Sequence, residues 1–343
     1  MDTKHFKNPV FYVSAIVIAL LVIIGAIMPK QFGEVANRLF LFTTSKFGWF
    51  YLIAVFVLVI FLAVLAFSRY GKIRLGGEEE RPDYPFFYMD RDVIFSRLWG
   101  GTRLLGCCGA DVSLFRDTIE GVEPLTEEAA RLAMGYSFFH WGVSQWSVFA
   151  IVGLVVAFMQ FRRRDAGLIS KAMEPVTGHK PVVTNTIDTL AVIATVMGVA
   201  TSLGLGVLQI NGGLSTISDI PSAVWVQLLI IVVMFVAYMT STFTGLDKGI
   251  KYLSNINLGL CLLLLVFVLI FGPTIFILNA FTLGIGDYIS NFINYSLRLQ
   301  PYKGGTWVRD WTVFYWAWAI AWSPLSVHLW LAYQKDAPSV SLF

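Results

Sequence analysis

Residues 48–67 read GWFYLIAVFVLVIFLAVLAF and contain no charged side chain. About 20 apolar residues in a helix are enough to cross the hydrocarbon core of a bilayer, which is about 30 Å thick. Before and after this stretch, the sequence predicts further spans at Val10–Met28, Tyr136–Phe161, Ile187–Ile210, Val224–Thr242, Ile256–Ala280 and Trp311–Leu331. We therefore expect an all-α polytopic membrane protein.

The composition of the 343-residue chain supports the same fold class. Hydrophobic residues make up 57% of the chain and charged residues 14%, whereas soluble domains contain roughly 45–50% and roughly 25%. The mean hydropathy is +0.70. These values argue against a soluble enzyme, and the net charge of +3 is too small to indicate a nucleic-acid partner.

Lysine and arginine residues predict the direction of the spans, because short cytoplasmic loops are enriched in both. Lys4 and Lys7 place the N-terminus in the cytoplasm, and the first span is interpreted as a retained helix rather than a cleaved signal. The Tyr136–Phe161 span ends in three arginines and therefore runs inward. An outward crossing is then required between Arg81 and Tyr136, where no apolar segment is long enough.

Residues 88–119, where that crossing is missing, carry several Asp and Arg side chains and the pair Cys107 and Cys108. Each charge would cost about 2.5–3.5 kcal/mol at the centre of a bilayer on insertion scales. From these residues alone, the segment is interpreted as a charged loop combined with an exception to the charge rule.

Five strings along the chain resemble the betaine/carnitine/choline transporter family. They are EEAARLAMGYSFFHWG (Glu127–Gly142), DTLAVIATVMGVATSLGLGVLQINGGL (Asp188–Leu214), GIKYLSNINLGL (Gly249–Leu260), FGPTIFILN (Phe271–Asn279) and DWTVFYWAWAIAWSP (Asp310–Pro324). The resemblance covers most of residues 1–324 and does not depend on any single motif. It implies a secondary transporter of quaternary ammonium or betaine-like solutes, such as glycine betaine, choline or carnitine, that takes up osmoprotectants. It also implies a multi-pass protein of the plasma membrane, in the lipid bilayer, with a homotrimer as the family's assembly.

The same resemblance implies a partial LeuT-type inverted-repeat fold with about seven of the family's twelve spans. It divides the chain into an N-terminal two-span region (1–87), an anomalous segment in place of the third span (88–120), the remainder of the first repeat (121–280), an amphipathic connecting segment (281–310), and the start of the second repeat with an aberrant C-terminus (311–343).

Two of these regions are consistent with breaks in the reading frame. Residues 88–119, reverse-translated and read one base later, can give the glycine-rich third span of the family. Residues 325–343, read two bases later, can give the family's sequence that follows the WSP motif at residues 322–324. We therefore expect a truncated product that does not itself transport, with divergence or a genuinely short paralogue as the alternative origin. The alternative function is a non-transporting membrane subunit or a regulatory fragment of a transporter.

Aromatic residues are the candidates for binding the solute. A trimethylammonium group has no N–H to donate, whereas an aromatic face attracts it by about 0.5–2 kcal/mol. At 100° per residue, the candidates fall within an arc of roughly 140° on the Tyr136–Phe161 helix and along one stripe of the Trp311–Leu331 helix. The predicted solute-binding residues are Trp141, Trp146, Phe149, Tyr315, Trp318 and Trp322.

By resemblance, the family's aromatic box is matched by Trp141, Trp146, Trp318 and Trp322. Phe149 stands where the family often has Tyr, which removes a hydroxyl, and Ala319 stands where many members have Trp, which removes an aromatic face. Without the resemblance, such aromatic stripes in membrane helices are more often packing residues or interfacial belts.

No cofactor is expected, and Na⁺ and H⁺ are the two candidate coupling ions. In sodium-coupled members two threonines one turn apart contribute to an ion site; Thr195 matches the first, but Val199 replaces the second. A proton relay has little support, because the carboxylate of Asp188 lies at a helix end. His140 has no partner histidine and is interpreted as a packing residue, so neither a metal site nor a catalytic residue is predicted, and a membrane-bound redox enzyme lacks its ligands.

Overall fold

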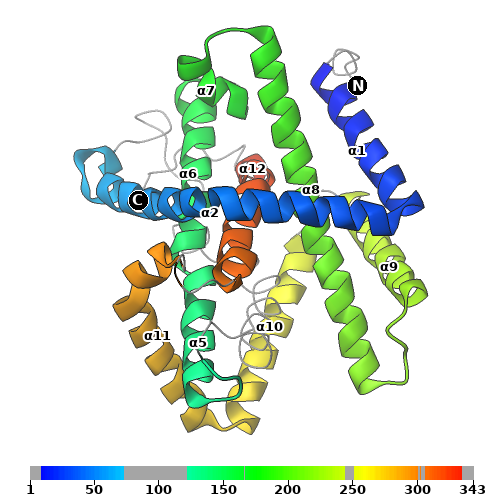
Figure 1. The fold of residues 1–343 in the computed structure, drawn as a ribbon, viewed down its shortest axis with the longest axis vertical. Coiled ribbons are helices and arrows are strands. Elements are labelled where there is room, and N and C mark those ends of the chain that lie inside the picture. Colours follow the sequence, from blue (N-terminus) through cyan, green and yellow to red (C-terminus); the bar gives the residue numbers. More distant parts are fainter. Residues whose placement is uncertain are drawn as a thin grey trace. The chain divides into compact units, whose positions relative to one another are not determined.

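The computed structural model describes residues 9–72, 122–165, 167–243, 251–299, 302 and 306–333. Among these residues there is no strand, as the all-α prediction requires. The elements are α1 (Pro9–Ile27), α2 (Pro29–Phe67), η2 (Arg69–Lys72), α5 (Glu127–Trp141), α6 (Val143–Ala157), η3 (Phe158–Arg162), α7 (Ile169–Thr177), α8 (Pro181–Ile217), α9 (Val224–Phe243), α10 (Lys251–Phe271), α11 (Thr274–Leu297), η5 (Val308–Val313) and α12 (Phe314–Tyr333), as labelled in Figure 1.

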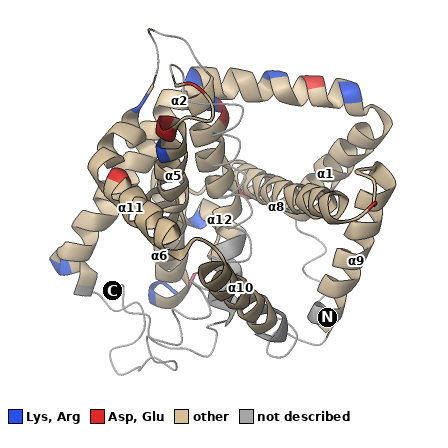
Figure 2. Ribbon diagram, turned by 90° about the horizontal axis from the view of Figure 1, so that it is seen from below, with Lys and Arg blue, Asp and Glu red and all other residues tan. Residues whose placement is uncertain are grey.

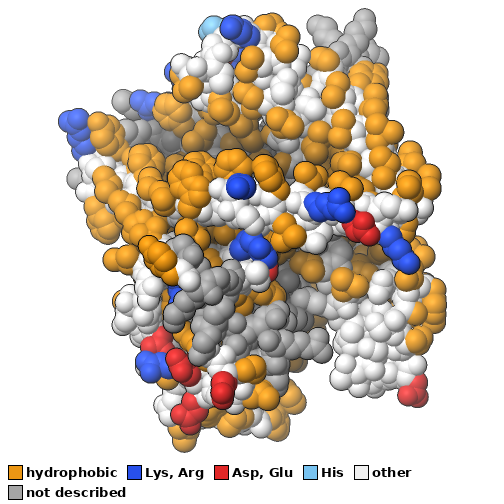
Figure 3. All heavy atoms as spheres, in the orientation of Figure 1, with side chains coloured by type: hydrophobic (Ala, Val, Ile, Leu, Met, Phe, Trp, Pro, Cys, Tyr) orange, Lys and Arg blue, Asp and Glu red, His pale blue; other side chains and the backbone are white. Residues whose placement is uncertain are grey.

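The helices have the length and apolar surface of a membrane protein. In the described part of the chain, five stretches are long and apolar enough to cross a bilayer, and two apolar helices, Val224–Thr240 and Asn255–Phe271, are shorter. Charged residues occupy only a few positions along the ribbon in Figure 2. Hydrophobic side chains cover much of the visible face in Figure 3. Many large apolar residues of the described chain are exposed, such as Val22 and Leu263. Such an outer surface is stable in lipid and unfavourable in water.

Two helices are longer than the spans predicted for them. α2 begins at Pro29 instead of Gly48, and α8 covers Pro181–Ile217 instead of Ile187–Ile210. At 1.5 Å per residue each is more than about 50 Å long, well beyond the thickness of the hydrocarbon core. Proline at the first position of α2 is favourable, because the N–H that it lacks has no partner at a helix start.

Two predicted spans are interrupted in the structure. The span predicted as Tyr136–Phe161 breaks at Gly142, between α5 and α6. The prediction of one helix over Ile256–Ala280 is wrong: α10 ends at Phe271, and α11 begins at Thr274. Pro273 explains the second break, since proline has no N–H for the helix and its ring clashes with the preceding turn. α11 also contains most of the stretch that was predicted as an amphipathic connection.

The helices group into two compact units. The first unit is built from Met1–Asp83, Gly142–Gly198 and Phe292–Phe343, and the second from Tyr84–Trp141 and Val199–Asn291. In the first unit α2 packs against α6, η5 and α12. The seam on α2 is a row of buried residues spaced three or four apart, Thr44, Gly48, Leu52 and Val55. This spacing keeps one narrow face of a long helix on its neighbours and leaves the rest outward.

In the second unit α5 and α11 are joined by an ion pair and a close helix contact. Arg131 donates from Nε to Asp287 Oδ2 at 2.5 Å and from Nη2 to Asp287 Oδ1 at 2.6 Å. Next to this pair, a Cβ on Gly284 would lie 2.6 Å from the ring of Phe138 and 2.8 Å from Met134. Any larger residue would have to displace these side chains, so glycine allows the two helices to approach closely.

The anomalous segment 88–120 and residues 334–343 of the aberrant C-terminus lie outside the described residues. The expected frame breaks therefore remain predictions from the sequence.

Candidate solute-binding site

Helices α6 and α12 lie side by side in the first unit, and α2 crosses both (Figure 1). Phe149 of α6 contacts Trp322 of α12, and one turn further along α6 a Cβ on Gly153 would lie 3.8 Å from Val327. Both helices advance from the first contact to the second, so they run in the same direction. The Lys/Arg bias predicts that the Tyr136–Phe161 span runs inward, so α12 would run inward with it.

Three of the predicted residues form one group of rings, which we call the aromatic cluster: Trp146, Phe149 and Trp322. The ring centroids of Trp146 and Phe149 are 5.6 Å apart, and those of Phe149 and Trp322 are 6.2 Å apart at an interplanar angle of 80°. All three side chains are half-buried. Residues far apart in the sequence thus form one group of contacting rings.

A second row of rings runs along α12 and its preceding turn. Trp311 contacts Tyr315 at 6.4 Å, and Tyr315 contacts Trp318 at 6.2 Å. Phe314 stacks on Trp318 at 6.4 Å with nearly parallel planes. The contacts follow the predicted spacing as far as Trp318. Tyr315 itself is buried, with 2% of its surface exposed, so packing accounts for much of its role.

Helix α8 is in close contact with α12 at Gly198. Trp318 donates a hydrogen bond from Nε1 to the carbonyl oxygen of Gly198 at 3.2 Å. A Cβ on Gly198 would lie 3.3 Å from both the Cβ of Ala321 and the backbone nitrogen of Trp322. Glycine at this position therefore allows the close approach that brings a carbonyl to the indole of Trp318.

Two buried polar atoms on the facing sides of α6 and α12 have no hydrogen-bond partner among the described residues. They are Oε1 of Gln145, whose residue is 5% exposed, and Nε1 of Trp322. Leaving such an atom unpaired in an apolar surrounding costs about 1–3 kcal/mol. Gln145 was missed in the sequence, although it is a polar residue one turn before Phe149 on an otherwise apolar helix face.

Trp141 and His140 end α5 and belong to the second unit. Trp141 is half-buried and directly precedes the break at Gly142. His140 is buried against the rings of Tyr136 and Phe139, with centroids 5.6 and 5.7 Å away. This environment fits the packing role expected for His140. The predicted place of Trp141 beside the aromatic cluster remains a prediction.

Thr195, the candidate ion ligand, lies on α8 one turn before Gly198 and is half-buried. Val199 follows one turn later, so the second threonine hydroxyl of a sodium site has no counterpart at that position. Ion binding at Thr195 therefore also remains a prediction.

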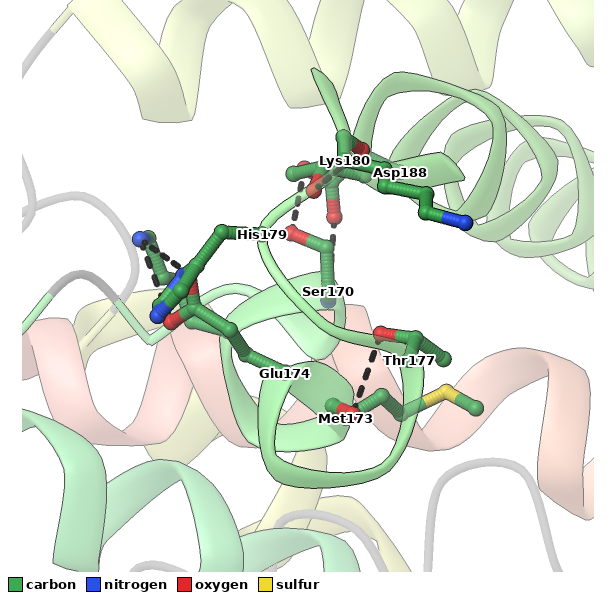
Figure 4. A network of polar contacts seen from close by, with 9 residues as sticks. Ser170, Met173, Glu174, Thr177, His179, Lys180 and Asp188 are labelled. Carbon is green, nitrogen blue, oxygen red and sulfur yellow. Dashed lines mark hydrogen bonds and ion pairs between the residues drawn. The ribbon is translucent and has the colours of Figure 1, made fainter. Parts of the chain in front are cut away.

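A polar network fixes the corner between α7 and α8 (Figure 4). Asp188 of α8 accepts hydrogen bonds from the hydroxyl of Ser170 at 2.7 Å and from its backbone N–H at 3.2 Å. Glu174 of α7 bonds with Lys171 of the same helix and with His179, which follows the helix. Partial desolvation raises the pKa of the Glu174 carboxyl, but its hydrogen bonds with His179 and Lys171 outweigh this and hold the pKa below its ordinary value. Asp188 thus has a structural partner at the start of α7.

Replacing Ser170 with alanine is expected to lower the free energy of unfolding by about 1.5 kcal/mol, because a hydrogen bond to a charged carboxylate is lost. Thermal unfolding of the detergent-solubilised protein measures the effect. Ser215→Ala is the matched control, since the Ser215 hydroxyl bonds to the Gly212 carbonyl within its own helix. An unchanged unfolding temperature for Ser170→Ala would show that this contact does not stabilise the corner.

A family profile described as betaine/carnitine/choline family transporter matches residues 9–332. The chain is 57% identical to the ectoine/hydroxyectoine transporter of Virgibacillus pantothenticus, over 94% of the chain and 65% of that relative. It is 42% identical to the glycine betaine transporter OpuD of Bacillus subtilis, over 94% of the chain and 63% of the relative.

A more distant similarity connects the chain to the high-affinity choline transport protein of Escherichia coli, with 33% identity over 96% of the chain. The chain spans 50% of that relative and 63–65% of the two more similar ones. It therefore corresponds to about half to two thirds of the length of these curated relatives.

Proposed function

The chain belongs to the betaine/carnitine/choline family of transporters, and on this premise we propose that the complete gene product that carries it mediates the secondary transport of zwitterionic and quaternary ammonium osmoprotectants. The proposed solutes are glycine betaine, choline, carnitine and ectoine. We propose the plasma membrane as its site of action, with a cytoplasmic N-terminus.

The observation that carries this proposal is the aromatic cluster. The rings of Trp146, Phe149 and Trp322 contact one another between apolar helices. A methylated ammonium group loses its hydration on entering such a site, and no hydrogen bond can replace it, but each aromatic face attracts the cation by about 0.5–2 kcal/mol. Aromatic faces of this kind favour weakly hydrated cations, such as methylated ammonium groups, over ordinary ammonium groups.

A second observation suggests how the carboxylate of a betaine is bound. The buried Nε1 of Trp322 has no acceptor in the described part of the chain, although its ring belongs to the aromatic cluster. A carboxylate at the edge of this ring would accept a charge-assisted hydrogen bond from the indole N–H. Trp322 would then bind both ends of a betaine, the cation by its face and the carboxylate by its edge.

The coupling ion is proposed to be Na⁺ or H⁺. Thr195 is the candidate sodium ligand, and Asp188 is a weak candidate for proton transfer because it already binds Ser170. Measuring solute uptake after Na⁺ in a choline-free medium is replaced by K⁺, at constant pH, distinguishes the two ions.

Uptake by cells tests the proposal. We expect the complete gene product that carries this chain to give saturable uptake of labelled glycine betaine in a strain without its own osmoprotectant transporters. Because the site binds the solute by aromatic faces, an excess of unlabelled betaine should compete and an excess of glycine should not. Uptake no higher than in cells without the gene, with the protein present in the membrane, would contradict the proposed function.

A further inference from the structure

Gln145 lies on the face of α6 that contacts α12. Phe149 is one turn after Gln145 on the same face and touches Trp322, and the row continues to Val156 and Ala157, which pack against Val327. The amide of Gln145 therefore belongs to the same helix–helix interface as the aromatic cluster and does not face lipid. Its burial, at 5% exposure, agrees with this position.

The parallel direction of the two helices sets the level of Gln145. Phe149 pairs with Trp322, so one turn earlier on both helices Gln145 comes level with Trp318. The indole N–H of Trp318 already donates to the carbonyl of Gly198. Trp318 thus offers an aromatic face at this level but no free donor, and Gln145 adds an oxygen acceptor at the same level of the interface.

An unpaired amide oxygen in an apolar interface favours one type of cation. A trimethylammonium group carries no N–H, so it leaves Oε1 of Gln145 without a partner. A cyclic amidinium, such as the ring of ectoine, is a planar cation whose N–H groups can donate in the plane of the ring while its faces stack on aromatic residues. The amide acceptor and the aromatic faces together complement such a ring.

We infer that Gln145 is a specificity-determining residue that accepts a hydrogen bond from an N–H-bearing cationic ring and so favours ectoine-type solutes over fully methylated betaines. The inference rests on the proposed function, because it concerns the same solute site. It would explain why the buried Oε1 of Gln145 has no hydrogen-bond partner in the described residues.

The test compares two solutes and two variants of the purified complete gene product by isothermal titration calorimetry. Gln145→Met keeps the length of the side chain and removes the acceptor, so ectoine should bind about 10- to 100-fold more weakly, the usual effect of losing a hydrogen bond to a charged group. Glycine betaine should bind within threefold of the unmodified protein. Ser147→Ala is the matched control on the same helix, because the buried Ser147 hydroxyl bonds to the Ser144 carbonyl; it should leave the ratio of the two affinities unchanged.

A second measurement needs no variant. Ectoine whose ring N–H groups are replaced by N-methyl groups should bind the unmodified protein at least about 10-fold more weakly than ectoine, for the same reason. Equal weakening of both solutes by Gln145→Met, or equal binding of the two rings, overturns the inference. If the unmodified protein binds neither ectoine nor glycine betaine, the proposed function itself is wrong.

Discussion

Replacing Trp322 with phenylalanine is expected to weaken the binding of glycine betaine by about 10- to 100-fold, because a charge-assisted hydrogen bond is worth about 1.5–3 kcal/mol. The phenyl ring keeps an aromatic face against Phe149 but has no N–H. Choline has the same trimethylammonium group and no carboxylate. Its affinity should therefore fall only a few-fold, by the difference between an indole face and a phenyl face.

Trp322→Leu extends this comparison by removing the face as well as the N–H. Both solutes should then bind more weakly than to Trp322→Phe, by up to about 30-fold for a desolvated cation–π contact of about 2 kcal/mol. Trp49 on α2 is the control, since 54% of its surface is exposed and Trp49→Phe should change neither affinity. Calorimetric titration of the purified protein measures all of these values. Equal losses of glycine betaine and choline in Trp322→Phe would contradict carboxylate binding by the indole edge.

The second large effect is expected at Gly198. Leucine there would push its Cβ to 3.3 Å from Ala321 and from the backbone nitrogen of Trp322, with the rest of the side chain inside the contact between α8 and α12. Overpacking of this kind costs about 1–3 kcal/mol or more. The displaced helix would also lose the hydrogen bond from Trp318. We therefore expect a large drop in unfolding temperature and loss of solute binding.

A compensating change makes this prediction specific. Gly198→Ala should destabilise less than leucine, and Ala321→Gly in the same protein should restore part of the loss, because it removes one of the two close contacts. Gly204→Ala is the control on the same helix, where a Cβ meets nothing within 4 Å. Alanine there should stabilise the helix slightly. Destabilisation of equal size at Gly204 would show that the α8–α12 contact is not the cause.

Much of the fold was predictable because membrane spans are determined by local composition. A run such as 48–67 must be a helix in lipid, since every backbone polar group needs an internal partner there. The position of breaks was harder to predict. Averaged hydropathy runs continuously from Ile256 to Ala280, whereas one residue, Pro273, ends α10 and separates it from α11.

The candidate site was predictable only in part. Spacing along one helix placed Trp311, Tyr315 and Trp318 on one stripe, and the structure has their rings in consecutive contact. Spacing does not say which rings of another helix they meet. It also did not distinguish Gln145 from the other polar residues of the predicted spans, because an unpaired amide is a property of the surrounding packing.

The sequence by itself thus determined that this chain is helical, spans a membrane and belongs to its family, because apolar runs and ordered motifs are local properties of the chain. Only the tertiary structure decided that Gln145 is buried, that Phe149 contacts Trp322, and that the carbonyl of Gly198 accepts the indole N–H of Trp318. These contacts join residues more than a hundred positions apart. They depend on which faces of two helices fit together, and that fit is set by side-chain shapes on both helices at once.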